Sequence, residues 1–406
     1  MRRVVSSHRD RWARALVVAP LALIVLCFPR VAQAFPWMIR HEYVGCTTCH
    51  HDPSGAGILT AYGRAQSEVL VRTPYGKPSE DDEDPSKLGK FALGVVPLPA
   101  VVDVQADGRL AWLRVAPPSP APATSRFVLM QSDLAGAIKL DHLRAAASVG
   151  YVHEGALGAS VTHGAEDRVV SRYHWAGASF DDDKLLVRAG RMPIPFGLRM
   201  MEHTMWVRSA TRTDINASQS HGLAMSLSTG SVRGELMAVA GNLQLAPPSL
   251  RERGYAGFLE YTPGPSFAAG ASSAILHAEL TVEEKKPAFR QAHGLFARWT
   301  PARPLVVLAE TDLLLRSVRG SKPFAGNASM LQLDVEPIQG VHAIATGELL
   351  CEKPSREGCS VGGWGSAAWF FLPHVDVRAD VIVRNVDAGG DRASVVTVLA
   401  QLHAFL

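Results

Sequence analysis

Two cysteines and a histidine lie within five residues of one another near the N-terminus. Cys46-Thr47-Thr48-Cys49-His50 has C-x-x-C-H spacing. This spacing lets two thiols bond to the vinyl groups of one haem while the adjacent histidine binds the iron from one face. We therefore predict that Cys46 and Cys49 attach a single c-type haem and that His50 is the proximal iron ligand.

Other chemistries also use closely spaced cysteines. A thioredoxin-like redox motif is set in a βαβ unit, and no such pattern surrounds Cys46 and Cys49. A zinc site needs a second ligand pair at short spacing, and none follows. A plain disulfide between the two cysteines stays open as an alternative, although it would not require His50.

The sixth coordination position of the iron has several candidate ligands. They are His41, His51 and Met38 nearby, and Met200, Met201 and His203 in a distant segment. A second histidine gives a lower reduction potential than a methionine. We expect His41 to be the distal ligand, because enough chain separates it from His50 to fold over the ring. His51 adjoins the proximal ligand and is expected to face solvent or a haem propionate.

Residues 1–34 have the organisation of a secretory signal peptide. Five arginines precede an uncharged run from Ala15 to Phe28, and Ala32-Gln33-Ala34 offers a cleavage site. The run would rise about 21 Å as a helix, which is too short to span a ~30 Å hydrocarbon core. Cys27 would leave with this peptide. Export agrees with the haem prediction, because covalent haem attachment takes place outside the cytoplasm.

Composition and charge exclude several classes of protein. The chain has 406 residues, 47% apolar and 19% charged, with 35 glycines, which excludes collagen, disorder and coiled coil. The formal net charge is +3, but residues 1–34 carry six arginines and one aspartate, which leaves −2 on the remainder. Global charge therefore gives no argument for a nucleic-acid partner.

Two further segments are predicted to be structural. Cys351 and Cys359 bracket a polar stretch and are expected to form a loop disulfide in an oxidising compartment, with two free thiols as the alternative. Residues 74–99 contain the acidic run Glu80–Asp84 between prolines and are interpreted as a solvated linker rather than a calcium site. We divide the chain into a signal peptide (1–34), a haem segment (35–73), this linker (74–99) and a β-domain (100–406).

From about residue 100, apolar and polar side chains alternate with a period of two. In the segment 375–384, the odd positions hold valines and an alanine, while Asp376, Arg378 and Asp380 occupy even positions. Such alternation is typical of strands with one apolar and one polar face. The predicted strands are 100–115, 126–139, 142–153, 168–180, 184–191, 222–228, 232–240, 254–262, 267–279, 290–300, 305–316, 328–336, 341–350, 364–372, 375–386 and 394–405.

The connections between these strands alternate between short turns, such as 373–374, and long loops, such as 192–221. Bacterial outer-membrane barrels have this arrangement. We therefore predict an all-β fold, an antiparallel transmembrane β-barrel of about 16 strands in outer-membrane lipid, with the haem segment periplasmic or in the lumen. The alternative, a soluble β-sandwich, would leave sheet edges that closure removes. Trp112, Trp175, Trp299, Trp364, Trp369 and Tyr261 are expected to form interfacial girdles.

Two segments resemble known proteins. Phe35–Arg40, the C-x-x-C-H motif and the stretch His51–Arg64 are similar to the N-terminal monohaem segment of porin-like outer-membrane proteins of Gram-negative bacteria, except that Ala56 interrupts the glycine turn. The stretch from Leu185 to Arg199, which contains Pro195-Phe196-Gly197, resembles a stretch of phosphate- and anion-selective porins. It opens the longest loop, 192–221, which is expected either to fold into the lumen or to remain an outer loop.

Two functions are expected. In the first, the barrel binds one haem c covalently and transfers electrons at or across the outer membrane, with a periplasmic or extracellular cytochrome as partner. In the second, the chain is a passive diffusion porin for anions or small solutes, and the haem is a plug, sensor or structural element. An enzyme such as a peroxidase is not expected, because no nucleophile–base pair or second metal cluster accompanies the motif.

Overall fold

The computed structural model describes residues 37–41, 45–55, 57–75, 89–118, 120–152, 168–200, 202, 204–215, 218–242, 252–280, 286–351, 358–387 and 392–406. The predicted signal peptide, residues 76–88 of the linker, Met201 and His203 lie outside the described residues. Among the described residues, no helix is long and apolar enough to cross a membrane.

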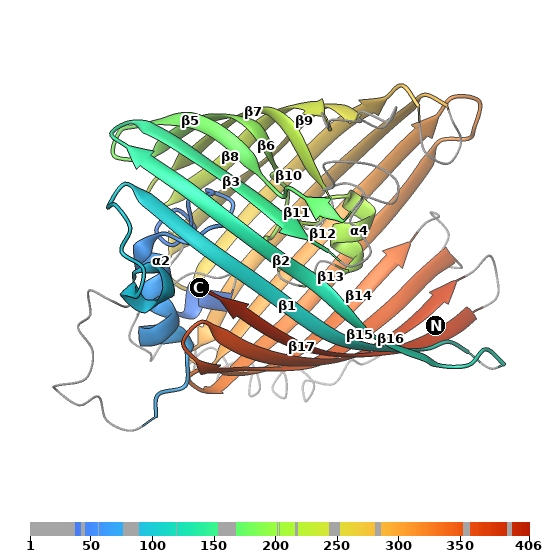
Figure 1. Ribbon diagram of the computed structural model, residues 1–406. Helices are drawn as coiled ribbons and strands as arrows, with labels where there is room; N and C mark the ends of the chain where they lie inside the picture. Colours follow the sequence, from blue (N-terminus) through green and yellow to red (C-terminus); the bar gives the residue numbers. More distant parts are fainter. Residues whose placement is uncertain are drawn as a thin grey trace, which may run out of the picture.

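The sheet closes into a barrel because β1 (Val102–Ala116) pairs antiparallel with β2 (Thr124–Leu140) on one side and with β17 (Arg392–Phe405) on the other (Figure 1). Between them, consecutive strands pair around the barrel. These strands are β3 (Leu143–Tyr151), β5 (His174–Phe180), β6 (Leu185–Pro193), β7 (Gln219–Ser228), β8 (Val232–Gly241), β9 (Glu252–Gly264), β10 (Phe267–Ala278), β11 (Ala288–Ala302), β12 (Leu305–Val318), β13 (Phe324–Ile338), β14 (Val341–Cys351), β15 (Cys359–Leu372) and β16 (Val375–Asp387). With the two-residue β4 (Val169–Val170), the sheet has 17 strands, so 16 longer strands enclose the barrel and confirm the predicted fold class.

One predicted strand, 168–180, is divided. β4 pairs with the end of β3, the chain then leaves the ladder, and β5 resumes the pairing from His174. The cause is Ser148, whose Oγ accepts hydrogen bonds from the backbone N–H groups of Arg172 and Tyr173 at 3.1 and 3.3 Å. A side chain thus takes over hydrogen bonds that a continuous strand would make with backbone groups.

The two faces of the strands follow the predicted alternation. In β16 the even positions Asp376, Arg378 and Asp380 are buried in the lumen, and Val381 is 50% exposed on the outer face. Outward-facing aromatics include Trp299 and Trp369, which are 43% and 44% exposed. The girdle prediction is wrong for two tryptophans. Trp175 and Trp364 are buried in the lumen, because both share a strand face with small residues that leave them space there.

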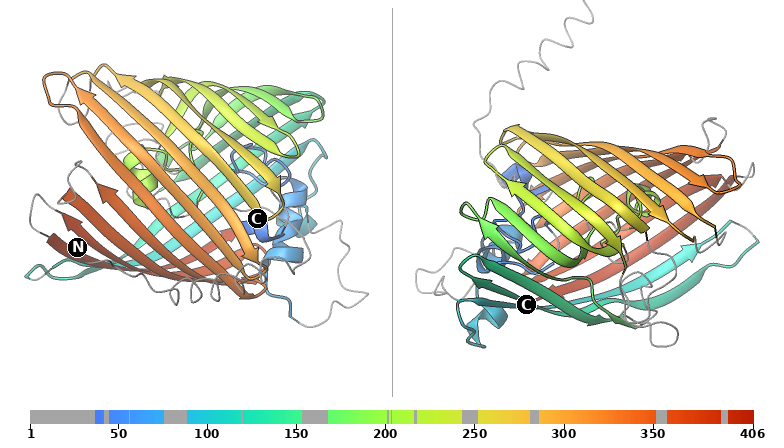
Figure 2. Two further views of the ribbon diagram at one scale, coloured as in Figure 1. Left: turned by 180° about the vertical axis from the view of Figure 1, so that it is seen from behind. Right: turned by 90° about the horizontal axis from the view of Figure 1, so that it is seen from above.

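Two segments fill part of the lumen (Figures 1 and 2). At the end of the short turns lies the N-terminal segment, with the 3-10 helix η1 (Trp37–His41), α2 (Ala61–Gln66) and the π-helix η2 (Ser67–Val71). η3 (Phe91–Gly94) then leads into β1. The loop after β6 carries α4 (Trp206–Thr211), which lies inside the barrel against β12, β13 and β14. Of the two paths left open by the sequence, the described part of this loop takes the inward one.

Candidate functional site

A single helical turn organises the C-x-x-C-H motif. The backbone N–H groups of Cys49 and His50 donate to the carbonyl of Cys46 at 3.2 and 2.9 Å. Residues three apart in such a turn share a face, so the two cysteines lie one above the other. Behind them, the N–H of Thr60 donates to the Cys49 carbonyl at 2.9 Å and ties the motif to α2.

The His50 imidazole is held by one nitrogen only. Its Nδ1 lies 3.4 Å from the carbonyl oxygen of Gly57, so Nδ1 carries the proton and donates. Burial lowers the pKa of His50 to about 4, which keeps the ring neutral at pH 7. A neutral ring whose Nδ1–H is bound to a carbonyl presents Nε2 as a metal ligand.

The two cysteines do not have the properties of a redox-active or zinc-binding pair. Both are free thiols, and Cys49 is only 6% exposed. Burial, with a smaller contribution from Cys46, raises the pKa of Cys49 to about 12. Reactive and metal-binding cysteines need an accessible thiolate, so the burial of Cys49 disfavours both chemistries at that residue. Cys46 is half-buried, and its Sγ accepts a hydrogen bond from Arg233 Nη1 at 3.0 Å.

A cavity adjoins the motif between the N-terminal segment and the barrel wall. It encloses about 850 Å³ of free space, part of it open to solvent, and Met38, Cys49 and His50 all line it. Its wall includes Phe370 and Arg109, whose Nε is buried without a hydrogen-bond partner. The lining also includes Asp107 and Asp376, and Cys49 is the cysteine of the motif that reaches it. A thiol beside a neutral histidine, a largely apolar wall and one guanidinium for a carboxylate are groups that could hold a covalently attached haem.

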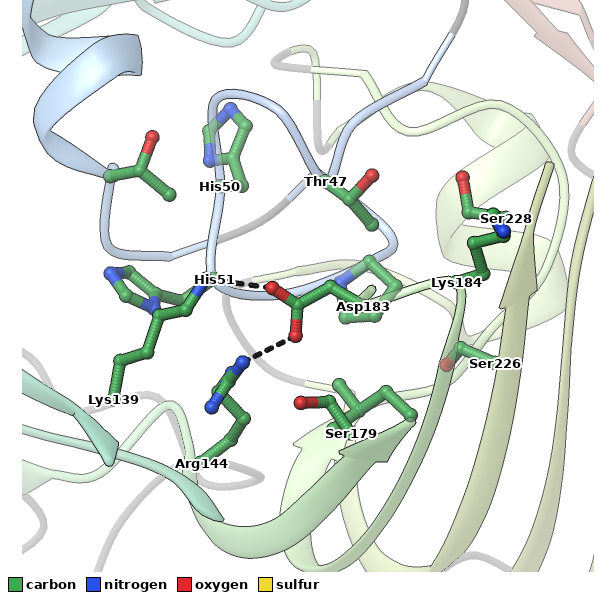
Figure 3. Close-up of a pocket in the computed structure, with 13 residues that line it drawn as sticks. Thr47, His50, His51, Lys139, Arg144, Ser179, Asp183, Lys184, Ser226 and Ser228 are labelled. Atoms are coloured by element: carbon green, nitrogen blue, oxygen red, sulfur yellow. Dashed lines mark hydrogen bonds and ion pairs between the residues drawn. The ribbon is translucent and has the colours of Figure 1, made fainter. Parts of the chain in front are cut away.

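A second cavity lies on another side of the motif, at the rim of the short turns, and is lined by Thr47 and His50 (Figure 3). On the barrel side, Asp183 accepts hydrogen bonds from Lys139 Nζ at 2.7 Å and from Arg144 Nη2. Burial alone would raise the pKa of Asp183, but its hydrogen bonds with Lys139, Ser179 and Arg144 and the charge of Lys139 hold it down at about 2. The rim is therefore a charged surface.

The N-terminal segment is bound to opposite walls of the barrel by buried polar contacts. Asp52 accepts from Arg188 Nη1 of β6 at 2.7 Å, and Arg188 Nη2 also donates to Glu235 of β8 at 2.7 Å. On the far wall, Arg40 Nε lies 2.9 Å from Glu336 Oε2 of β13. Burial would raise the pKa of Asp52, but the charge of Arg188 and hydrogen bonds from Arg188 and Ser54 hold it below its ordinary value.

Three further contacts seal the segment against the barrel. His51 Nε2 lies 2.8 Å from Asp103 Oδ2, and Gln105 Oε1 accepts from the N–H of Leu59 at 2.8 Å. The N–H of Thr73 donates to the carbonyl of Phe370 at 2.8 Å. The predicted haem segment is thus a plug in the barrel mouth, and the name N-terminal plug is used below for residues 37–75.

His41, the expected distal ligand, does not line the cavity beside His50. Its Nε2 lies 3.2 Å from Glu336 Oε2, and it points to the β13 wall. His51, expected to face solvent or a haem propionate, has a largely buried side chain in contact with Asp103. Met38 shares the cavity with His50, whereas Met200 is buried in the inward loop.

The inward loop, of which residues 194–200, 202, 204–215 and 218 are described, is anchored to the lumen wall by charges. Glu310 of β12 accepts hydrogen bonds from Arg208 Nη2 and from the N–H of Leu198. Arg378 of β16 donates to Glu202 at 2.7 Å. These buried pairs hold α4 across the lumen.

A wide cavity opens at the long-loop end, beyond α4. It encloses about 1350 Å³ of free space and is lined by four basic side chains, Arg212, Arg290, Arg316 and Lys322. None of its described lining residues is acidic, although Glu252 pairs with Arg290 at 2.6 Å and with Arg212 at 3.4 Å from beside it. The described lining of this cavity therefore carries more basic than acidic side chains.

Sequence reasoning missed the residues that hold the plug and the inward loop. Arg188, Glu235 and Glu310 lie within predicted strands, but the sequence did not single them out. The available signal was their position on lumen-facing faces of strands, where a buried charge requires a partner. The disulfide between Cys351 and Cys359 was predicted and is present at the long-loop end.

Comparison with known proteins shows the fold. No family model and no curated protein matches the chain. Among solved structures, an anion-selective porin from Comamonas acidovorans is similar at 11% identity and a TM-score of 0.59, over 75% of this chain and 99% of that one. A loop-deletion mutant of OmpT, an outer membrane protein of Vibrio cholerae, matches at 10% identity and a TM-score of 0.56, over 75% and 99%.

The outer membrane channel DcaP of Acinetobacter baumannii matches at 8% identity and a TM-score of 0.52, over 74% of this chain and 96% of that one. At these identities the likeness establishes a porin-type outer-membrane barrel fold. It gives no support to the haem prediction.

Proposed function

We propose that the chain is a channel of the bacterial outer membrane through which small anionic solutes diffuse. The observation that carries this proposal is the wide cavity at the long-loop end, whose described lining contains four basic and no acidic side chains. A charged, low-dielectric entrance concentrates solutes of the opposite charge and increases their rate of entry. Similarity to an anion-selective porin favours this function over electron transfer.

The lumen is lined by polar side chains, and two segments of the chain narrow it. Charged residues line it along strand after strand, as in β16, and the inward loop lies across it. The N-terminal plug occupies the opposite mouth. We therefore expect small conductance steps, which increase when the plug leaves the mouth.

Ion selectivity in planar bilayers tests the channel proposal. With the full-length protein and a KCl gradient, the reversal potential is expected to have the sign of chloride preference. The double variant Arg316→Gln, Lys322→Gln should reduce that preference, and Lys184→Gln, which removes a charge at the opposite rim, serves as the matched control. Preference for potassium, or no conductance at all, would overturn the proposal.

A second candidate function is covalent haem binding with electron transfer. The specific observation in its favour is the arrangement around His50, with free thiols one helical turn apart, a neutral ring that presents Nε2, and an adjoining cavity. Cys46 and Cys49 would hold the group, which would supply a one-electron redox centre. One such centre cannot bridge a ~30 Å membrane core, so a partner cytochrome would receive or deliver the electron.

A pyridine haemochrome spectrum of the detergent-extracted outer membrane, with haem staining of the denatured chain, tests this second candidate. The wild type should retain haem after denaturation, and the Cys46→Ser, Cys49→Ser variant should lose it. A colourless wild-type chain, expressed together with the haem-attachment machinery, would overturn haem binding and leave the channel proposal intact.

A further inference from the structure

Four residues with sulfur or nitrogen donors that can bind iron line one cavity. His50, Cys49 and Met38 line it from the N-terminal plug, and His403 lines it from β17. If Cys49 forms a thioether and His50 binds the iron, Met38 and His403 are the donors that remain among the described residues lining this cavity. The candidate ligands differ in the hydrogen bonds that each would lose on moving to an iron.

His403 in the cavity wall, and His41 and His51 beside the motif in the sequence, each contact a carboxylate. His403 Nδ1 lies 2.8 Å from Asp376 Oδ2, and its Nε2 lies 3.1 Å from Asp107 Oδ1, so neither nitrogen is available. His41 Nε2 contacts Glu336 at 3.2 Å, and His51 Nε2 contacts Asp103 at 2.8 Å. Moving any of these rings to an iron would break a buried contact between an imidazole and a carboxylate.

Met38 has no such competing contact to lose. It belongs to η1, is 3% exposed, and has an uncharged thioether as its only functional group. Methionine has flexible torsions and fills irregular apolar space, so its sulfur can move within the cavity without breaking a hydrogen bond. Arg40, which lies two residues after Met38, forms an ion pair with Glu336. This pair fixes η1 to the β13 wall and keeps Met38 at the cavity.

We propose that Met38 is the second axial ligand of the iron, in place of the His41 expected from spacing. This inference rests on the second candidate function above, covalent haem binding. A histidine and a methionine on one iron give a higher reduction potential than two histidines. The redox partner would therefore be a carrier of relatively high potential.

Spectroscopy and redox titration of the purified, haem-loaded full-length chain test the assignment. The wild type should show the near-infrared band of a ferric haem with thioether ligation. Met38→Leu, which keeps the apolar volume, should lose that band, lower the midpoint potential and admit cyanide rapidly, while the covalent haem content stays unchanged. Met38→His should restore a six-coordinate, low-spin iron at lower potential than wild type.

His41→Gln is the matched control and should leave the band and the potential unchanged. If wild type carries covalent haem and Met38→Leu changes neither the band nor the potential, or if His41→Gln abolishes the band, the assignment of Met38 is wrong. If wild type carries no covalent haem, the second candidate function fails instead, so the two failures are distinguishable.

Discussion

Asp52 provides the most direct perturbation of the contact between the N-terminal plug and the barrel. Asp52→Ala removes the carboxylate that Arg188 contacts at 2.7 Å and that also accepts hydrogen bonds from the N–H and Oγ of Ser54 at 2.8 and 2.6 Å. Because Asp52 belongs to the plug, the substitution leaves every barrel side chain in place. The expected effect is release of the plug without unfolding of the barrel.

The magnitude follows from the burial of the pair. Removing one partner of a buried ion pair costs about 3–5 kcal/mol. Arg188 keeps Glu235 at 2.7 Å, so its charge stays partly compensated and the lower end, about 3 kcal/mol, applies. At about 1.4 kcal/mol for each factor of ten, the docking equilibrium of the plug should weaken about 100-fold.

Hydrogen exchange measures this change. The amides of Thr60 and Arg64, which donate to Cys49 and Thr60 in the plug, should lose about 100-fold in protection, while amides of the barrel strands keep theirs. Lys184→Ala, which removes an exposed pair with Asp181, is the control and should change plug protection by less than about 1 kcal/mol. Unchanged protection of the plug in Asp52→Ala would refute the docking account.

Three further predictions concern the lumen, the rim and the long-loop end. Arg208→Met breaks the buried pair with Glu310 and should free the inward loop at a cost of about 3–5 kcal/mol, seen as larger single-channel conductance. Burial lowers the pKa of His374 to about 4, and the charge of Arg64 lowers it further. Because the docked plug favours the neutral imidazole, His374 contributes its full stabilisation above about pH 6.5. That stabilisation is lost as pH falls towards 4, by about 2 kcal/mol at pH 5, and exchange at η2 should show a loss that His374→Asn abolishes. Reducing the disulfide at Cys351 should cost no more than about 2.5 kcal/mol and should leave conductance unchanged, because strand pairing already joins its two ends.

Strand alternation made most of the barrel predictable. The expected strand 232–240 is observed as Val232–Gly241, and 375–386 as Val375–Asp387. Period-two patterning reports directly which side of a sheet is apolar, and short turns between long loops fix the topology. The division of the predicted strand 168–180 escaped prediction because the Ser148 hydroxyl replaces backbone hydrogen-bond partners there. The hydrophobic pattern does not specify such a contact.

The site was predictable only in its local part. The haem site at Cys46, Cys49 and His50 stays a prediction from spacing, and the structure adds that the three residues share one helical turn. The pairing of Asp52 with Arg188 joins residues 136 positions apart, and no periodicity specifies it. His41 was favoured on chain length alone, which could not reveal that Glu336 binds its imidazole.

Cross-linking in isolated outer membranes tests the central claim that the chain's own N-terminal plug closes the short-turn mouth of a porin-type barrel. Thr73 Oγ1 donates to the Gln339 carbonyl at 3.1 Å, whereas Lys322 lies at the long-loop end. With a short bifunctional thiol reagent, the variant Thr73→Cys, Gln339→Cys should form an intramolecular link, and Thr73→Cys, Lys322→Cys should form none. Absence of the first link, or formation of the second, would contradict the account.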